Sequence, residues 1–436
     1  MSELMYSQPG TAGYRDATTP RNSSASQHPA LVASPRSAAE LAAAVGYAAQ
    51  HGLTAVPQAT GHGASGELGD GVLLIDTARL DTVHIDAGRR RAVVGAGCQW
   101  GAINAAAERH GLLGRSGSAP DVSVCGFTFG GGAGWLTRPH GLASGALAAV
   151  DFVDGTGRIR RASDDAPDEG DREAIYAFRG GGGVGVAATL EFDLAAVTDL
   201  WAGYLLWPFE HLDSVAGAWA DALARIGQAL STSISVLSAP PGPPFPPGLQ
   251  GTRVVHLAVA CSTGEADAAP LFDALSAVAT PTVNTWGRAD AARLGGIHLD
   301  PPAAGPALGI AHWLDAAAPS VAPAVLRAAA DSPIEMIEIR NVGNDAPVLD
   351  GAMTRPIGDF ILHAVGDQSD PQGREAAFAR VLAAAAPADT KLSLGSWADG
   401  RASVPDALTP KARSRVAAAR AAVDPEGTIA PSRFLA

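Results

Sequence analysis

The sequence predicts an α+β protein with two kinds of sheet. Within the first 60 residues a strand at residues 30–33, a helix at 38–51 and a strand at 53–56 follow one another, and the second strand runs into a glycine-rich turn. After residue 197 strands are followed by long helices. This second pattern predicts an antiparallel sheet that helices cover on one face, with the other face free to cover a ligand.

Length and composition limit the possible classes of protein. The chain has 436 residues, 47% of them hydrophobic and 17% charged, which is typical of a globular protein of two or three domains. Its net charge of -13 argues against nucleic-acid binding, which depends on clustered Lys and Arg. Cys98, Cys125 and Cys261 are an odd number without CxxC spacing, so we expect buried thiols and neither disulfides nor a zinc site.

The N-terminal region carries no recognisable targeting signal. Residues 1–10 have neither a basic stretch nor an apolar core, and residues 1–27 are polar and rich in Pro, Gly, Ser and Thr. We therefore expect an irregular N-terminal arm and a cytoplasmic location. No apolar stretch is long enough to predict a membrane span, and no membrane partner is expected.

Local patterns place the remaining elements of the first half. The helix at 38–51 has Ser37 as its cap and Gly52 at its end. The acidic stretch 163–173 is expected to be a loop. The other expected elements are strands at 72–75, 82–85, 92–94 and 184–194, a helix at 100–110, and a hairpin of strands 148–153 and 158–161.

In the second half, alternating and helical patterns follow one another. A proline-rich loop is expected at 239–248, and Asp424-Pro425 ends a helix at 409–423. The expected strands are 201–207, 254–261, 309–314, 334–340 and 359–365, and the expected helices are 212–230, 265–279, 320–330 and 372–386.

Three glycine-rich runs stand beside apolar segments. The first spans residues 58–66 and contains His62; the second is Gly130 to Gly134; the third is Arg179 to Gly183. Glycine lets the backbone approach a bulky anion closely while its N–H groups stay free. Three such turns fit a long cofactor with two phosphates better than a single nucleotide on one loop.

As an ordered set, these segments resemble the FAD-linked oxidases whose FAD domain is of the vanillyl-alcohol-oxidase (PCMH) type, and more closely their berberine-bridge-enzyme-like branch. The resembling segments are residues 57–65, 73–80, 93–101, 126–135, 179–192 and 423–429. The resemblance implies an arm at 1–27, a two-part FAD-binding domain at 28–197, a substrate domain at 198–390, and a segment at 391–436 that returns to the FAD domain.

The resemblance also implies how FAD is held. His62 would be joined to the flavin 8α-carbon. Many relatives add a cysteinyl bond where this chain has Ala119, and Cys125 lies six residues further on, so we expect one covalent bond. The other expected FAD-binding residues are Ala59, Thr60, Gly61, Gly63, Ala64, Gly66, Gly117, Ser118, Ser123, Gly126, Thr128, Gly130, Gly131, Gly132, Gly134 and Val186. No metal is expected.

The catalytic residues depart from the family pattern. His363 stands where relatives carry a Glu or Gln above flavin N5, and imidazole can accept a proton at neutral pH. A strand His that faces solvent or helices is an equal alternative. The tyrosines of relatives are replaced by Leu394 and Ala133, and one residue is missing beside Val184. Tyr204 and His312 are the next candidates for the base, whereas Glu338 and Arg340 are expected to form a surface ion pair.

The activity implied by the resemblance is that of an FAD-dependent oxidase. Hydride would pass from a small organic substrate to flavin N5, with molecular oxygen as acceptor, in the biosynthesis of a specialised metabolite. A flavin dehydrogenase with another acceptor and a redox-silent flavoprotein or binding module remain alternatives. The oligomeric state is not predicted.

Overall fold

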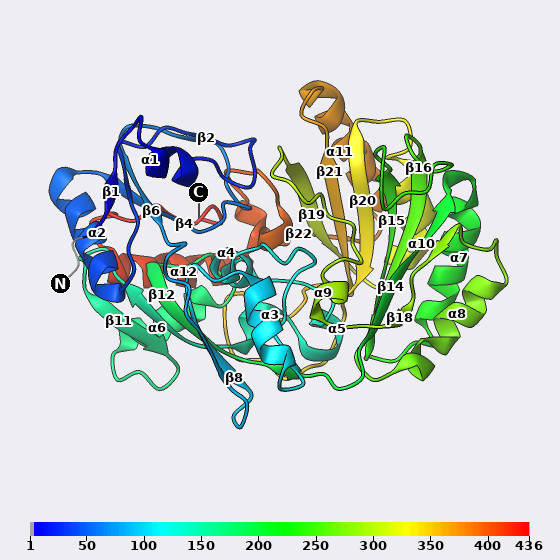
Figure 1. Ribbon diagram of the computed structural model, residues 1–436, viewed down its shortest axis with the longest axis horizontal. Coiled ribbons are helices and arrows are strands. Elements are labelled where there is room, and N and C mark those ends of the chain that lie inside the picture. Colours follow the sequence, from blue (N-terminus) through cyan, green and yellow to red (C-terminus); the bar gives the residue numbers. More distant parts are fainter. Residues whose placement is uncertain (1–3, 436) are drawn as a thin grey trace.

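The computed structural model describes residues 4–435, which form two lobes with the first part of the chain and the C-terminal helix in one lobe (Figure 1). The other lobe is a large sheet with helices on its outer face. No helix within residues 4–435 is long and apolar enough to cross a membrane. The cytoplasmic location stays a prediction.

A small, mostly parallel sheet carries the first glycine-rich turn at its edge. Its strand order is β1 (Tyr6–Ser7), β3 (Leu31–Ala33), β6 (Val72–Asp76) and β4 (Thr54–Gln58). Helix α2 (Ala38–His51) connects β3 to β4; the Ser37 side chain caps its first turn, and Gly52 ends it with φ of 66°. Because β4 ends at Gln58, the His62 turn leaves the sheet at the carboxyl end of a strand, where ligands of α/β units bind.

An antiparallel five-stranded sheet completes the first lobe. Its order is β11 (Ile159–Ser163), β10 (Leu147–Val153), β12 (Val186–Asp193), β8 (Arg91–Gly95) and β7 (Val83–Asp86). Helices α3 (Trp100–Glu108), α4 (Val124–Phe129), α6 (Glu169–Phe178) and the 3-10 turn η1 (Ala143–Ala146) belong to the same lobe, whereas α5 (Thr137–His140) contacts β15 of the second lobe.

The end of the chain packs against this first lobe. Helix α12 (Pro410–Val423) lies against α6, with Arg415 paired to Glu173 at 2.7 Å. Beyond it the backbone runs beside β4, because Ala55 N–H donates to Thr428 O at 2.8 Å and Ala430 N–H donates to Ala55 O at 2.9 Å. Residues far apart in sequence thus meet where the His62 turn begins.

The second lobe is built on a nine-stranded sheet. Its order is β17 (Val283–Asn284), β14 (Trp201–Pro208), β16 (Arg253–Cys261), β15 (Leu230–Ser238), β20 (Ile334–Asn341), β21 (Phe360–Gly366), β19 (Leu308–Leu314) and β22 (Asp389–Ser393), with β18 (Gly287–Arg288) also on β14. Helices α7 (Leu212–Leu223), α8 (Ala269–Ser276), α10 (Ala318–Arg327) and α11 (Pro371–Ala385) pack on one face.

Alternation along the strands gives this sheet two different faces. Ile337 and Ile339 pack into the apolar core under the helices, whereas Glu338 and Arg340 point to the opposite face. The expected antiparallel sheet with helices on one face is confirmed. The remaining described elements are α1 (Ala12–Ala17), α9 (Ala291–Leu294), β2 (Ser26–Gln27), β5 (Glu67–Leu68), β9 (Leu112–Leu113), β13 (Ala195–Ala196), η2 (Phe209–His211), η3 (Glu265–Ala268), η4 (Gly395–Trp397) and η5 (Pro405–Ala407).

Three local expectations were wrong. The arm contains α1 and β1, and β1 pairs with β3. The helix expected at 212–230 ends at Leu223, and residues 230–238 form the central strand β15, where buried serines alternate with apolar residues at a period of two. The acidic stretch starts α6 because the Asp168 side chain caps it. The apolar approach to the second glycine run, for which no element was predicted, forms the short helix α4.

Candidate cofactor and active site

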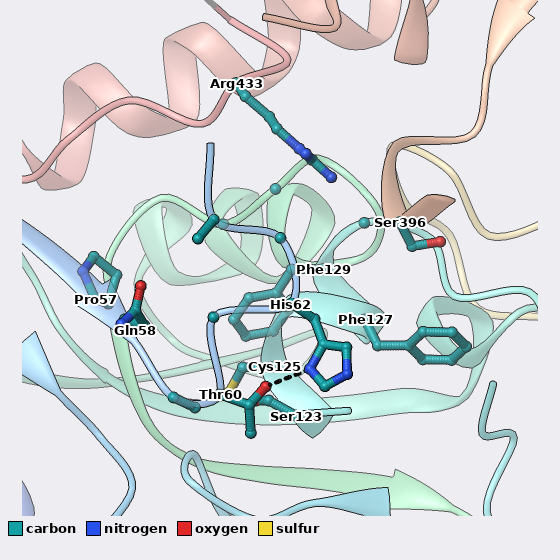
Figure 2. A pocket seen from close by; sticks show the side chains of 18 of the residues that line it. Pro57, Gln58, Thr60, His62, Ser123, Cys125, Phe127, Phe129, Ser396 and Arg433 are labelled. Atoms are coloured by element: carbon teal, nitrogen blue, oxygen red, sulfur yellow. Dashed lines mark hydrogen bonds between the residues drawn. The ribbon is translucent and has the colours of Figure 1, made fainter. Parts of the chain in front are cut away.

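A cavity of about 690 Å³ separates the glycine-rich turns from the second lobe. Its first wall consists of the His62 turn, residues 117–119, the third glycine run and the C-terminal tail; its opposite wall includes His298, Asp300, Arg340 and His363. Figure 2 shows the first wall around His62. This volume lies within the usual range for small-molecule and cofactor sites.

The N-terminal arm fixes the His62 turn. Gly61 has φ of 71°, and a Cβ there would lie 2.5 Å from Pro20 Cβ, so only glycine fits without strain. The next two arm residues hold the turn through backbone bonds: Arg21 N–H donates to Thr60 O at 2.9 Å and Asn22 N–H donates to Gly61 O at 3.1 Å. The arm therefore belongs structurally to the site.

The His62 imidazole has one engaged and one open nitrogen. Nδ1 is 3.0 Å from the Thr60 hydroxyl (Figure 2). Nε2 lies 3.3 Å from Asp121 Oδ1 but has no hydrogen-bond partner within residues 4–435. Burial lowers the pKa of His62, although the charge of Asp121 opposes this shift. A neutral imidazole with an open nitrogen is the form that can bond to an electrophilic carbon.

Glycines of the second and third runs also bring backbone to the cavity. A Cβ at Gly130 would lie 2.9 Å from Ser396 Cα, and a Cβ at Gly182, whose φ is 88°, would lie 1.8 Å from Ser432 Oγ. In contrast, Gly131, Gly132 and Gly134 lie outside the cavity lining. As at Gly130 and Gly182, their missing side chains make room for protein atoms: a Cβ at Gly134 would meet Ser116 O at 1.7 Å.

Most of the predicted FAD-binding residues line this one cavity. They are Ala59, Thr60, Gly61, His62, Gly63, Ala64, Gly117, Ser118, Ser123, Gly126, Gly130 and Val186. Gly66 and Thr128, like Gly131, Gly132 and Gly134, lie outside the lining.

The C-terminal tail contributes residues that sequence reasoning missed. Residues 429–434 line the cavity, and Arg433 reaches from the tail toward the His62 turn (Figure 2). Its guanidinium donates to Ala398 O at 2.8 Å and to Gly395 O, and burial lowers its pKa. The nearest atom to a Cβ at Gly63 would be Arg433 Nη2, at 4.0 Å. A lone Arg near the end of the chain gives no sequence signal for this position.

The three cysteines differ in whether they reach the cavity. All three are free; Cys98 and Cys261 are buried, whereas Cys125 lines the cavity. Burial raises the pKa of Cys98 to about 11 and raises that of Cys125 further, so both remain thiols at neutral pH. Ala119 lies in the lining at the place where relatives carry the linking cysteine. No group of three or more potential metal ligands occurs in the described part of the chain.

On the opposite wall, His363 faces the cavity. It lies on β21 directly across from Glu338 on β20 and is 9% exposed. Its Nε2 is 3.0 Å from Asp399 Oδ2, and its ring centroid is 5.0 Å from that of Trp397. The alternative that His363 faces the helices is therefore wrong. Asp399, missed by sequence reasoning, comes from the loop after η4.

The other two candidate bases lie outside the cavity lining. Ala311, not His312, is the register partner of His363, so the period of two turns His312 to the opposite face, where Nδ1 lies 3.2 Å from Asp389 Oδ1. Tyr204 lies on β14, near the far edge of the sheet from β21, with its ring 5.7 Å from that of His256.

A buried charged cluster replaces the expected surface ion pair. Glu338 and Arg340 are both 0% exposed, and Arg340 Nε donates to Glu338 Oε1 at 2.7 Å. His298 lies between Asp300, at 2.7 Å, and Glu338, at 3.1 Å. Burial alone would lower the pKa of His298, but the two carboxylates raise it to about 10, so His298 is an imidazolium at neutral pH.

Comparisons with known proteins agree with this geometry. A family model described as "FAD binding domain" matches residues 29–163. The (R)-6-hydroxynicotine oxidase of Paenarthrobacter nicotinovorans is 31% identical over 215 residues, which are 48% of this chain and 46% of the relative. The FAD-linked oxidoreductase pytB of Aspergillus terreus is 33% identical over 188 residues, 43% of this chain and 23% of that one. These sequence matches span less than half of either relative.

The similarity of fold extends over the whole chain. The crystal structure of 6-hydroxy-D-nicotine oxidase from Arthrobacter nicotinovorans has a TM-score of 0.82 at 21% identity, covering 100% of this chain and 98% of that one. The BBE-like 1 protein of Physcomitrella patens has a TM-score of 0.81 at 17% identity, covering 99% and 97%. Residues 29–163 thus match an FAD binding domain, and the chain shares its fold with 6-hydroxy-D-nicotine oxidase and the BBE-like 1 protein.

Proposed function

We propose that this protein is an FAD-dependent oxidase of a small organic molecule, with FAD bound in the cavity and joined to His62. The proposal rests on one observation: two walls of different character face each other across one cavity. One wall presents glycine backbone and the open Nε2 of His62; the other presents His363 with its partner Asp399.

The cavity fits FAD on the chemistry of its own residues. Glycines at positions 61, 63, 130 and 182 leave backbone at the surface of the cavity, as close approach of a large cofactor requires. Arg433 adds a cation beside Gly63. His62 would hold the flavin through an imidazole nitrogen, Ala119 offers no second bond, and Arg433 would face the negative part of the cofactor.

The chemistry that FAD supplies when bound is the acceptance of a hydride from a substrate C–H bond, with molecular oxygen as the final acceptor of the two electrons. The substrate also loses a proton, and oxygen leaves as hydrogen peroxide. The residues of the chain must therefore position the substrate and take up that proton.

His363 would take the proton from the substrate heteroatom. Because Nε2 is engaged by Asp399, Nδ1 is the ring nitrogen left to accept it. The carboxylate of Asp399 would fix the orientation of the ring and stabilise the imidazolium that forms, while Trp397 supports one side of the ring. In this role Asp399 is a positioning residue.

The relatives' names indicate candidate substrate classes. They include an oxidase of hydroxynicotine and an oxidase of xylooligosaccharide, so cyclic amines and sugars belong on a test panel with alcohols and aldehydes, each with and without a carboxylate. We place the protein in specialised metabolism because it lacks the tyrosine pattern of the resembling enzymes: Leu394 and Ala133, which are buried outside the cavity lining, stand at those positions.

Anaerobic reduction followed by air tests the proposal. Purified protein should carry a flavin spectrum, at least one compound of the panel should bleach it without oxygen, and air should restore it with one equivalent of peroxide. Bleaching that air reverses slowly, but that a quinone reverses quickly, would indicate a dehydrogenase. A protein without flavin, or with flavin that no compound reduces, would contradict the proposal.

A further inference from the structure

Arg340 presents two unused hydrogen-bond donors in the wall opposite the glycine runs. The side chain is 0% exposed and lines the cavity. Its Nε donates to Glu338, but Nη1 and Nη2 have no hydrogen-bond partner within residues 4–435. A buried charged donor without an acceptor costs more free energy than a neutral one, so an acceptor is expected in the cavity.

Neighbouring residues hold the guanidinium in one orientation. Its central carbon lies 3.8 Å from the ring centroid of Trp135 and 4.5 Å from that of Trp397. Glu338, which fixes Nε, is itself held by His298, and His298 is held by Asp300. Because rotation about the last bonds is blocked by the two indoles and by Glu338, the open edge formed by Nη1 and Nη2 keeps one direction.

The open donors of Arg340 favour an anionic acceptor. Glu338 and Asp300 balance the charges of Arg340 and His298, so the cluster is neutral and what Arg340 lacks is hydrogen-bond acceptors for Nη1 and Nη2. The Arg charge is permanent, and its planar pair of terminal amino groups matches the two oxygens of a carboxylate. Asp300 lines the same cavity with Oδ2 unpartnered, which leaves an acceptor for a hydroxyl or amine of the same ligand.

We propose that Arg340 binds a carboxylate of the substrate, which makes the substrate a small organic acid. The inference rests on the proposed function, since it places the substrate in the FAD cavity. Arg340 and His363 lie on adjacent strands and on the same face, because Arg340 pairs with Ile361 and Glu338 pairs with His363. Such diagonal neighbours are about 7–8 Å apart, so the oxidised carbon would lie only a few bonds from the carboxylate.

Binding of an inert acid tests this inference without turnover. Benzoate and the neutral benzamide are titrated into flavin-loaded protein by calorimetry, with the flavin absorbance recorded in parallel. Benzoate should bind more tightly than benzamide. Arg340→Met should weaken benzoate binding roughly 10- to 100-fold, the usual loss for hydrogen bonds to a charged group, and should leave benzamide almost unchanged.

Two further variants keep the test decisive. Arg340→Lys retains the charge but loses the planar pair of donors, so it should show an intermediate loss even if Arg340→Met does not fold. Arg374→Gln is the matched control, because Arg374 is also buried but lies on α11 at the helix-covered face and donates to Asp367 O and Gln368 Oε1. It should leave benzoate binding unchanged.

The outcomes separate this inference from the proposed function. Equal binding of benzoate and benzamide, or unchanged benzoate binding in both Arg340 variants with normal flavin content, would overturn the carboxylate site and leave the oxidase proposal intact. Absence of flavin from the wild-type protein would overturn both.

Discussion

The two walls of the cavity differ in what they offer a ligand. The wall of the first lobe is largely backbone, with glycines such as Gly61, Gly130 and Gly182 at the surface. The wall of the second lobe is formed by side chains, among them Arg340 and His363, on one face of a sheet. A wall of backbone lets a large cofactor that a whole family shares approach closely, whereas individual side chains select one substrate. The comparison places cofactor binding and substrate choice in different parts of the chain.

Gly61→Ala should have the largest effect, because it acts on the first wall as a whole. The substitution puts a Cβ 2.5 Å from Pro20 Cβ at φ of 71°, and a left-handed conformation alone costs a non-glycine residue about 1–2 kcal/mol. We expect displacement of the His62 turn and loss of most of the bound flavin, measured as the ratio of flavin to protein absorbance.

Gly69→Ala is the control for that experiment. Gly69 has no other atom within 4 Å of a built Cβ, so flavin content should not change. Gly63→Ala sharpens the comparison, because the new Cβ has space in the protein: the nearest atom, Arg433 Nη2, is 4.0 Å away. A loss of flavin without a loss of thermal stability would therefore show that the ligand fills this space. Full flavin content in Gly61→Ala would contradict the proposed role of the turn.

His363→Gln tests the second wall alone. Flavin content should stay normal, because His363 lies opposite the glycine runs, while anaerobic flavin reduction should slow by about 10²- to 10⁴-fold, the usual contribution of a positioned acid or base. Stopped-flow absorbance with a substrate from the panel gives the rate. An unchanged reduction rate would exclude His363 as the base.

Asp399→Asn should have a smaller effect on the same step. The loss of the carboxylate partner should slow flavin reduction by about 10- to 100-fold, the range found for residues that orient metal-binding histidines. It should also shift the pH profile of reduction to lower pH, since an imidazolium without its carboxylate is less stable and the neutral base therefore forms at a lower pH. A lower rate with an unmoved profile would indicate a merely structural role.

The difference between the walls also explains what the sequence could predict. The first wall could be predicted because close backbone approach requires glycine, which leaves ordered runs around His62, Gly130 and Gly182. The α+β fold followed from helical and alternating patterns. The tail residue Arg433 and the arm residue Pro20 could not be predicted as site residues, because their places depend on contacts between distant segments.

For the second wall, register was the missing information. His363 and His312 are alike as single residues, and only the pairing of His363 with Ala311 shows that they point to opposite faces. Similarly, Glu338 and Arg340 share one face in any strand, but burial of that face depends on the first lobe covering it. The central strand β15 was missed: residue 230 was placed at the end of the preceding helix and 231–238 were assigned to no element, whereas the serines of this strand are buried and Ser235 pairs with both His256 and Glu338.

The pH dependence of stability tests the buried charged cluster of the second wall. His298 has a pKa of about 10 in the folded protein and an ordinary pKa near 6.5. At pH values between 6.5 and 10 the folded state therefore keeps a proton on His298 that the unfolded state has released. The stabilisation is therefore complete below about pH 6.5 and is lost as the pH rises toward 10. Urea unfolding at several pH values should show this decline, and His298→Gln should flatten it; an equally steep decline in the variant would assign it to other groups.

The most direct test of the account is the site of covalent flavin attachment. The protein is precipitated in acid, washed, digested, and the flavin-bearing peptide is identified by mass spectrometry. We predict that the flavin stays with the polypeptide, that it maps to His62 in the peptide containing residues 58–66, and that His62→Ala releases all flavin on precipitation. Complete release from the wild-type protein, or attachment at Cys125, would contradict the assignment.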